Sequence, residues 1–203
     1  DNYLDLNELK KIKTLSSIKG DISPDLFEDD LTKSTLSSIR AMKEIQAENG
    51  EKACNRYIIS NNQSALNILE VFTMFRLSDW DNPTVDIVPL FETVSDLKVA
   101  SKVMDLVYSN PIYKKHLERR KNQQTIMLGF SDGTKDGGYL MANWSILKAK
   151  ESLTSISRKY GVKVVFFDGR GGPPARGGGN THQFYASMGT FVESDEIQLT
   201  VQG

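Results

Sequence analysis

The sequence predicts an α/β protein in which parallel strands alternate with helices. Short β-branched or aromatic runs are centred near Ile58, Val88, Leu128 and Val165, and segments with helical spacing of apolar residues separate them. The run from Val162 to Phe167 has no helical period, which is typical of a parallel strand covered on both faces. Roughly four strand-helix units joined by right-handed crossovers are therefore expected. They could form half of an eight-unit barrel or a small doubly wound sheet.

The chain is expected to contain two segments of different character. Residues 1–50 would form a helical and linker segment, with a loose helix in 1–32 and an amphipathic helix from Ser34 to Glu48 that ends at Asn49-Gly50. Residues 51–203 would form the strand-helix units, which make a partial barrel in the first of these two architectures. The strands are expected at 55–60, 85–91, 125–130 and 162–167, with a further strand at 197–201. The helices are expected at 64–76, 94–108, 113–121 and 139–159. A glycine turn is expected between the third strand and the last helix.

Composition limits the kind of partner that the chain can have. The 203 residues contain 25 Lys and Arg against 26 Asp and Glu, a net charge of −1, which argues against a general nucleic-acid or membrane binder. No spanning segment or secretion signal is recognisable. Cys54 is the only cysteine and cannot form an internal disulfide, so a reducing, cytoplasmic setting and a structural role for Cys54 are expected.

A glycine-rich loop with two arginines follows the strand at 162–167. Glycine permits positive φ and close approach of the backbone, so such a loop can turn several N–H groups toward one anion. Arg170 and Arg176 add planar guanidinium groups suited to phosphate or carboxylate, and Thr181 is expected to cap a following helix. The alternatives are a flexible surface loop or an RNA-binding RGG segment, but the position between a strand and a helix favours an anion site. The glycines are Gly169, Gly171, Gly172, Gly177, Gly178 and Gly179.

Charged side chains follow the expected strands. Glu92 follows the second strand, Asp132 and Lys135 follow the third, and Asp168 with Arg170 follows the fourth. In either architecture the binding face lies at the carboxyl ends of the strands. Two carboxylates there suit Mg²⁺ or Mn²⁺, and the lysine and arginines would hold a phosphate. The residues therefore predict a metal-assisted site for a phosphorylated acid.

Simpler roles exist for several of these residues. Glu92 and Asp132 could be helix caps or first-turn acids. His116, in the run KKHLERRK, is expected on an exposed helix face. Trp80 and Trp144 are expected to be core or packing residues rather than stacking platforms.

The chain resembles phosphoenolpyruvate carboxylases over roughly its last three quarters. The matching segments are YIIS from Tyr57, VPLFETVSDL from Val88, MLGFSDGTKDGG from Met127 and DGRGGPPARGGGNTH from Asp168. The resemblance implies a (β/α)₈ TIM-type barrel with extra helices. It also implies conversion of phosphoenolpyruvate and bicarbonate to oxaloacetate and phosphate through carboxyphosphate and an enolate, in a homotetramer.

The resemblance also implies roles for individual residues. Glu92 and Asp132 match the metal-binding carboxylates, and Lys135 matches an active-site lysine. Arg170 and Arg176 match the two arginines of the glycine loop, and the second is associated in the family with inhibition by aspartate or malate. Gly171, Gly172, Gly177 and Gly178 would bind the anion beside the two arginines.

Two departures from the family pattern bear on these roles. Asp168 stands where the family motif has histidine, so it could orient Arg170, bind the metal indirectly or mark a divergent subgroup. Family chains are several times longer, so this chain is expected to be an internal fragment with little activity alone, whose unpaired sheet edges favour association. The alternatives are another Mg²⁺-dependent barrel enzyme acting on a phosphorylated enol, and a non-catalytic anion-binding module.

Overall fold

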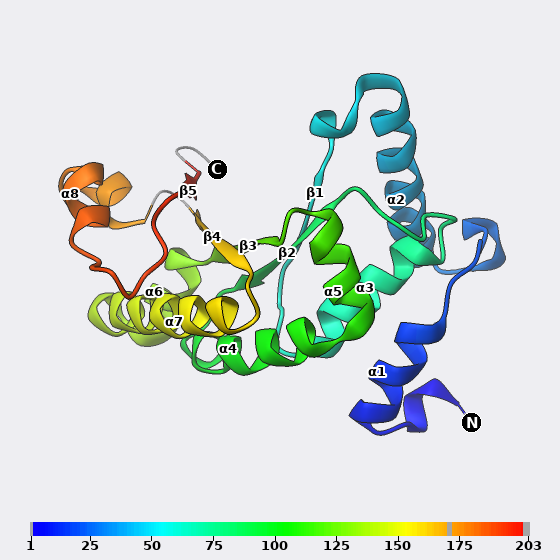
Figure 1. Cartoon of the computed structure of the whole chain (residues 1–203), viewed down its shortest axis with the longest axis horizontal. Helices are drawn as coiled ribbons and strands as arrows, with labels where there is room; N and C mark the ends of the chain where they lie inside the picture. The colour runs from blue at the N-terminus through cyan, green and yellow to red at the C-terminus, as the bar shows by residue number, and fades with distance from the viewer. Residues whose placement is uncertain (1, 170–171, 201–203) are drawn as a thin grey trace.

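A computed structural model describes residues 2–169 and 172–200, and its centre is a five-stranded, all-parallel sheet (Figure 1). The strands lie in the order in which they occur in the chain, β1-β2-β3-β4-β5. The most complete pairing joins β3 to β4, with Gln123 opposite Lys163 and Leu128 opposite Asp168. The strands are β1 (Arg56–Ile59), β2 (Asp86–Phe91), β3 (Gln123–Leu128), β4 (Lys163–Asp168) and β5 (Ile197–Leu199).

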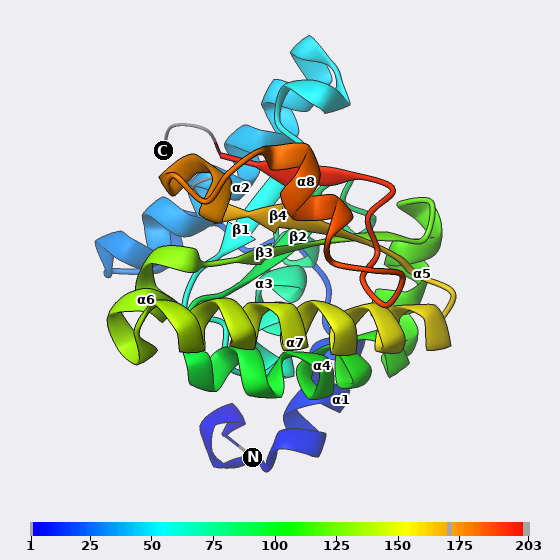
Figure 2. The same cartoon turned by 90° about the vertical axis from the view of Figure 1, so that its left-hand side faces the viewer.

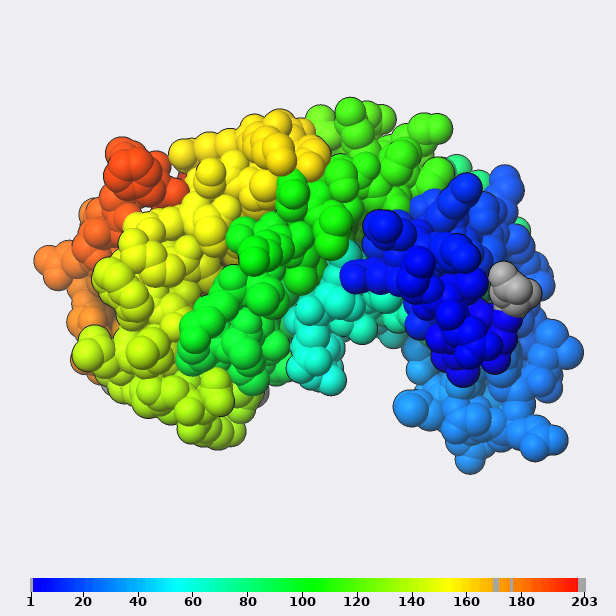
Figure 3. Space-filling view, turned by 90° about the horizontal axis from the view of Figure 1, so that it is seen from below, coloured from blue at the N-terminus to red at the C-terminus, as the bar shows by residue number. Residues whose placement is uncertain are grey.

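The long helices of the first three β-α-β connections cover one face of this sheet, whereas α8 (Thr181–Ala186), in the connection from β4 to β5, lies on the other side (Figure 2). The long helices are α3 (Ala65–Arg76), α4 (Val94–Ser109) and α7 (Tyr139–Lys159), and α4 lies against both α3 and α7. Figure 2 shows α4 and α7 below the sheet and α8 above it, and Figure 3 shows α3, α4 and α7 side by side from outside. A doubly wound sheet has helices on both faces. The sequential strand order and the cover of one face by all the long crossover helices are instead consistent with part of a (β/α) barrel.

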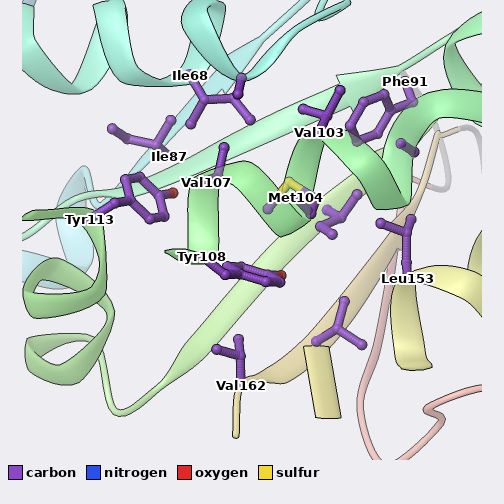
Figure 4. Packing of buried hydrophobic residues seen from close by; sticks show 14 of the residues in the cluster. Ile68, Ile87, Phe91, Val103, Met104, Val107, Tyr108, Tyr113, Leu153 and Val162 are labelled. Carbon is purple, nitrogen blue, oxygen red and sulfur yellow. The ribbon is translucent and has the colours of Figure 1, made fainter. Parts of the chain in front are cut away.

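The hydrophobic core lies between the sheet and these helices (Figure 4). Ile87 and Phe91 of β2 face Met104 and Val107 of α4, and all four side chains are at most 1% exposed. The capping box of α4 starts the helix directly after β2, since Thr93 accepts from the backbone of Asp96 and the Asp96 carboxylate accepts from that of Thr93. The packing therefore fixes the end of β2, where the candidate site begins.

The N-terminal segment packs against this core rather than lying loose. Helix α1 (Glu8–Ser17) lies against α3, and the buried Arg76 donates to the carbonyls of Leu15 and Ser16, at 3.3 Å each. Helix α2 (Asp30–Asn49) begins four residues earlier than predicted, because Asp29 caps it. The 3₁₀ turns are η1 (Tyr3–Asp5), η2 (Pro24–Leu26), η3 (Glu51–Ala53) and η5 (Pro173–Arg176).

Several local predictions were wrong. The expected glycine turn after β3 is helix α6 (Phe130–Gly137). Helix α5 (Pro111–Arg119) starts at Pro111, because proline fits the first helical position and Asn110 caps it. His116 is buried, not exposed, and its ring packs on Phe72 with the centroids 4.9 Å apart. Of the two tryptophans expected to be core or packing residues, Trp80 packs against the core, whereas Trp144 is 56% exposed and so is not a core residue.

Candidate functional site

One cavity at the carboxyl ends of the strands brings together three of the predicted site residues. It has a volume of about 370 Å³, and Glu92, Asp132 and Lys135 all line it. Gly169, the first residue of the glycine-arginine loop, lines it as well. The remaining lining residues are Leu90, Met127, Gly129, Phe130, Ser131 and Thr200. The cavity therefore joins the ends of β2, β3 and β4 to the start of α6.

Two glycines let α6 approach the end of β2. A Cβ atom at Gly129 would lie 3.2 Å from Glu92 Cα, and one at Gly133 would lie 3.3 Å from the Glu92 carbonyl oxygen. Because these contacts are tighter than side chains ordinarily make, larger residues would push α6 away from Glu92. Gly129 and Gly133 thus serve close packing of a helix, which explains why a turn was predicted there wrongly.

The surroundings of Glu92 differ from those of a helix cap. Thr93, not Glu92, caps α4. The Glu92 carboxylate instead accepts a hydrogen bond at 3.1 Å from the backbone N–H of Asn61, which follows β1 and has a left-handed φ of 52°. Glu92 is thus oriented by the end of the neighbouring strand, as a ligand-binding carboxylate requires.

Asp132 lies in the first turn of α6, so the alternative role of a first-turn acid is met. Asp132 also lines the cavity. Lys135 Nζ lies 3.0 Å from Asp132 Oδ1, and the two side chains are 77% and 49% exposed. An ion pair this exposed is worth about 0–1 kcal/mol, so a bound cation or anion could separate it at little cost. The pair can therefore exchange partners when ligands bind.

The donor set fits a hard divalent cation that keeps most of its water. Two carboxylates, Glu92 and Asp132, line the same cavity. Within the described part of the chain, no group of three or more His, Cys, Asp or Glu residues is arranged to hold a metal. Mg²⁺ is usually bound in this manner, through one or two carboxylates together with water and substrate phosphate.

The glycine-arginine loop is described only in part. Arg170 and Gly171 lie outside the described residues, as does the side chain of Arg176. Gly172 has φ 62°, and a Cβ atom there would lie 3.2 Å from the ring of Phe130 in α6. The loop is therefore in contact with the helix that carries Asp132 and Lys135.

The end of the loop makes internal hydrogen bonds. The N–H groups of Gly177 and Gly178 donate to the carbonyls of Pro174 and Pro173, at 3.3 and 2.7 Å. A Cβ atom at Gly178 would lie 2.5 Å from the Pro173 oxygen, so only glycine fits. Anion binding by these two N–H groups stays a prediction and would require them to change partners. The predicted cap of α8 was wrong by one residue, since Asn180 rather than Thr181 caps it.

Asp168 is buried at the end of β4 and makes contacts that the sequence did not reveal. Its Oδ2 atom accepts from Lys150 Nζ at 2.8 Å and from the Tyr185 hydroxyl at 2.6 Å. Burial and the adjacent carboxylate raise the pKa of Tyr185, so its hydroxyl stays protonated and donates. Lys150 could have been noticed, because it falls between Ile146 and Leu153 on the apolar face of α7.

Fold and site together define an α/β protein with a carboxylate-lined, lysine-bearing cavity at the carboxyl ends of parallel strands. The family model for phosphoenolpyruvate carboxylase matches residues 1–203. The chain belongs to this family.

Similar curated proteins include three phosphoenolpyruvate carboxylases. Those of Nitrosomonas europaea and Nitrosomonas eutropha are 39% and 38% identical over 98% of the chain. That of Gloeobacter violaceus is 33% identical over 99% of the chain. The chain spans about a fifth of the length of these relatives, 21% to 22%. Across the described residues, no helix is long and apolar enough to cross a membrane.

Proposed function

We propose that this chain is the part of a phosphoenolpyruvate carboxylase that holds the divalent metal and the phosphate-binding loop. The observation that carries the proposal is the single cavity lined by Glu92, Asp132 and Lys135 beside the start of the glycine-arginine loop. Family membership supplies the reaction: phosphoenolpyruvate and bicarbonate give oxaloacetate and phosphate, through carboxyphosphate and the enolate of pyruvate.

The sheet would be part of a (β/α)₈ barrel completed by segments outside this chain. One row of side chains across the sheet supports a barrel. Strand pairing places Leu90 of β2, Met127 of β3 and Phe167 of β4 in this row. They alternate with the core residues along each strand, so they lie on the face that the long crossover helices do not cover. They are only half-buried, as the inner residues of an incomplete barrel would be.

Glu92 and Asp132 would hold Mg²⁺ or Mn²⁺. When bound, the metal supplies positive charge for the oxygen of the enolate. The hydrogen bond from Asn61 keeps the Glu92 carboxylate oriented before any ligand arrives. Lys135, released from Asp132, would then be free to neutralise the phosphoryl group.

Arg170 and Arg176 would complete the phosphate site from the loop side, since a guanidinium binds two phosphate oxygens at once. The packing of Gly172 on Phe130 keeps the loop close to α6 and so close to Lys135. Exclusion of water from this site would protect carboxyphosphate and the enolate from side reactions.

Further protein contacts are proposed for the start of α7. Tyr139, Leu140 and Trp144 are 57%, 83% and 56% exposed, which is unusual for adjacent large apolar residues on one helix. We expect them to be covered by the rest of a longer chain or by another subunit, in an oligomer for which the family resemblance suggests a tetramer.

The test is Mn²⁺ binding measured by water-proton relaxation, with and without phosphoenolpyruvate. The wild-type chain should bind Mn²⁺, and phosphoenolpyruvate should strengthen that binding. Asp132→Asn should weaken it at least tenfold, because a neutral amide is a poorer ligand. Asp136→Asn is the matched control: it lies on the same helix outside the cavity, and an amide can still accept the hydrogen bond that Asp136 receives from Val94.

Three results would contradict the proposal. The first is Mn²⁺ binding that Asp132→Asn and Asp136→Asn change equally. The second is no Mn²⁺ binding by a folded chain. The third is phosphate binding that needs no metal and survives Asp132→Asn, which would instead support the non-catalytic anion-binding module.

A further inference from the structure

Three buried side chains from three elements meet at the base of the glycine-arginine loop. Lys150 of α7 and Tyr185 of α8 both donate to Oδ2 of Asp168, at 2.8 and 2.6 Å. Asp168 is 0% exposed, Lys150 1% and Tyr185 8%. These three residues are called the Asp168 cluster below.

The cluster is held tightly on the lysine side. Lys150 Nζ lies 5.4 Å from the ring centre of Phe166 and 5.3 Å from that of Tyr185. Its charge is therefore in contact with two aromatic rings and one carboxylate, away from water. A buried ion pair of this kind keeps its geometry, because moving either partner leaves a charge unpaired in the interior.

The cluster ties together the two ends of the loop. Asp168 ends β4 directly before the loop, and Tyr185 lies in the helix directly after it, 17 positions along the chain. Their hydrogen bond joins the two ends of this segment, and the ion pair with Lys150 attaches Asp168 to the long helix α7. Closing a segment of this length removes many of the conformations that its backbone could adopt.

The second oxygen of Asp168 is not used in the same way. Asp168 Oδ1 is buried and has no hydrogen-bond partner among the described residues. Asp168 directly precedes Gly169, and Gly169 lines the cavity together with Glu92 and Asp132. The cluster thus holds one carboxylate oxygen and leaves the other for a donor of the loop or of a ligand.

We propose that Lys150 and Tyr185 are positioning residues that hold Asp168 and thereby fix the two ends of the glycine-arginine loop beside the cavity that would receive the phosphate of the substrate. Neither residue touches the reacting atoms. They act by preorganisation, because a loop whose two ends are already held together has less conformational entropy to lose when the anion binds. The identity of the anion rests on the proposed function, whereas the fixing of the loop does not.

The first test needs no ligand. Trypsin cleaves after arginine, so its rate of cleavage after Arg170 and Arg176 reports how often the loop opens. Tyr185→Phe removes one hydrogen bond and should raise this rate about tenfold, which corresponds to about 1.4 kcal/mol in the opening equilibrium. Tyr160→Phe is the matched control: it also removes a tyrosine bond to an aspartate, 2.7 Å to Asp105, but at a surface site, and it should leave loop cleavage unchanged.

The second test separates positioning from general stability. At a temperature where both proteins are folded by circular dichroism, Tyr185→Phe should change the affinity for Mn²⁺ alone by less than twofold. It should reduce the strengthening by phosphoenolpyruvate about tenfold. If the role of Tyr185 were purely structural, Tyr185→Phe would leave the strengthening by phosphoenolpyruvate unchanged, or would weaken that strengthening and the affinity for Mn²⁺ alone equally.

The outcomes distinguish the two proposals. Equal loop cleavage in Tyr185→Phe and the wild type overturns the positioning role. Faster cleavage with an unchanged response to phosphoenolpyruvate overturns its link to the phosphate. A wild-type chain that does not respond to phosphoenolpyruvate contradicts the proposed function, and the comparison of cleavage rates then decides the positioning role alone.

Discussion

Replacing Lys150 by methionine should be among the most destabilising single changes in this chain. Methionine has a similar length and no charge, so the substitution leaves Asp168 as an unpaired carboxylate in the interior. Asp168 is 0% exposed and would keep one hydrogen bond, from Tyr185. Breaking a buried ion pair in this way typically costs about 3–5 kcal/mol.

The cost should depend on the charge that remains rather than on lost packing. Adding Asp168→Asn to Lys150→Met removes that charge while keeping the shape of the side chain. The double variant should therefore recover more than half of the lost stability. Lys148→Met is the matched control on the same helix: its ion pair with Glu151 is 51% and 30% exposed, so its loss should cost less than about 1 kcal/mol.

Urea unfolding followed by circular dichroism at pH 7 measures all four proteins, provided that the slopes of the transitions agree. The reasoning would be refuted if Lys150→Met cost no more than Lys148→Met. A double variant as unstable as the single Lys150→Met variant would show that packing, not charge, explains the effect.

Three further predictions concern a buried histidine and two glycines. Burial lowers the pKa of His116 to about 3, so the unfolded chain binds a proton at a higher pH than the folded chain does. The free energy of unfolding should therefore fall as the pH drops from about 6.5 toward 3, by up to about 1.4 kcal/mol per pH unit. Urea unfolding of His116→Gln should lack this contribution, and a pH dependence identical to that of the wild type would contradict the assignment. Gly133→Ala should weaken Mn²⁺ binding several-fold in relaxation measurements, because its Cβ would lie 3.3 Å from the Glu92 carbonyl and move α6; unchanged affinity would refute the role of close packing. Gly178→Ala should speed trypsin cleavage of the loop, since its Cβ would lie 2.5 Å from the Pro173 oxygen, and an unchanged rate would show that the loop relaxes freely.

The sequence predicted the strands well because their signal is local. The β-branched run at Val164 and Val165 marks a strand, and the pair Asn49-Gly50 marks a helix end, without reference to the rest of the chain. The parallel direction of the strands followed from the repeated strand-helix units. The choice between a doubly wound sheet and a barrel segment did not, because it depends on which face the helices cover.

The errors have a common physical cause, which is tertiary contact overriding local preference. Gly133 lowers helix propensity, yet α6 forms because glycine lets it pack against Glu92. His116 lies in a charged run, yet its own position faces Phe72 in the core. The sequence could list Asp168 at a strand end, but its pairing with Lys150 and Tyr185 joins residues that are distant in the chain.

The central claim is that metal and phosphate share one site in this chain, and the phosphorus NMR signal of phosphoenolpyruvate tests it most directly. Mn²⁺ bound to Glu92 and Asp132 should broaden that signal in the presence of the wild-type chain, because paramagnetic relaxation falls steeply with distance. Glu92→Gln should remove the protein-dependent broadening. Binding of both Mn²⁺ and phosphoenolpyruvate without such broadening would place them in separate sites and contradict the account.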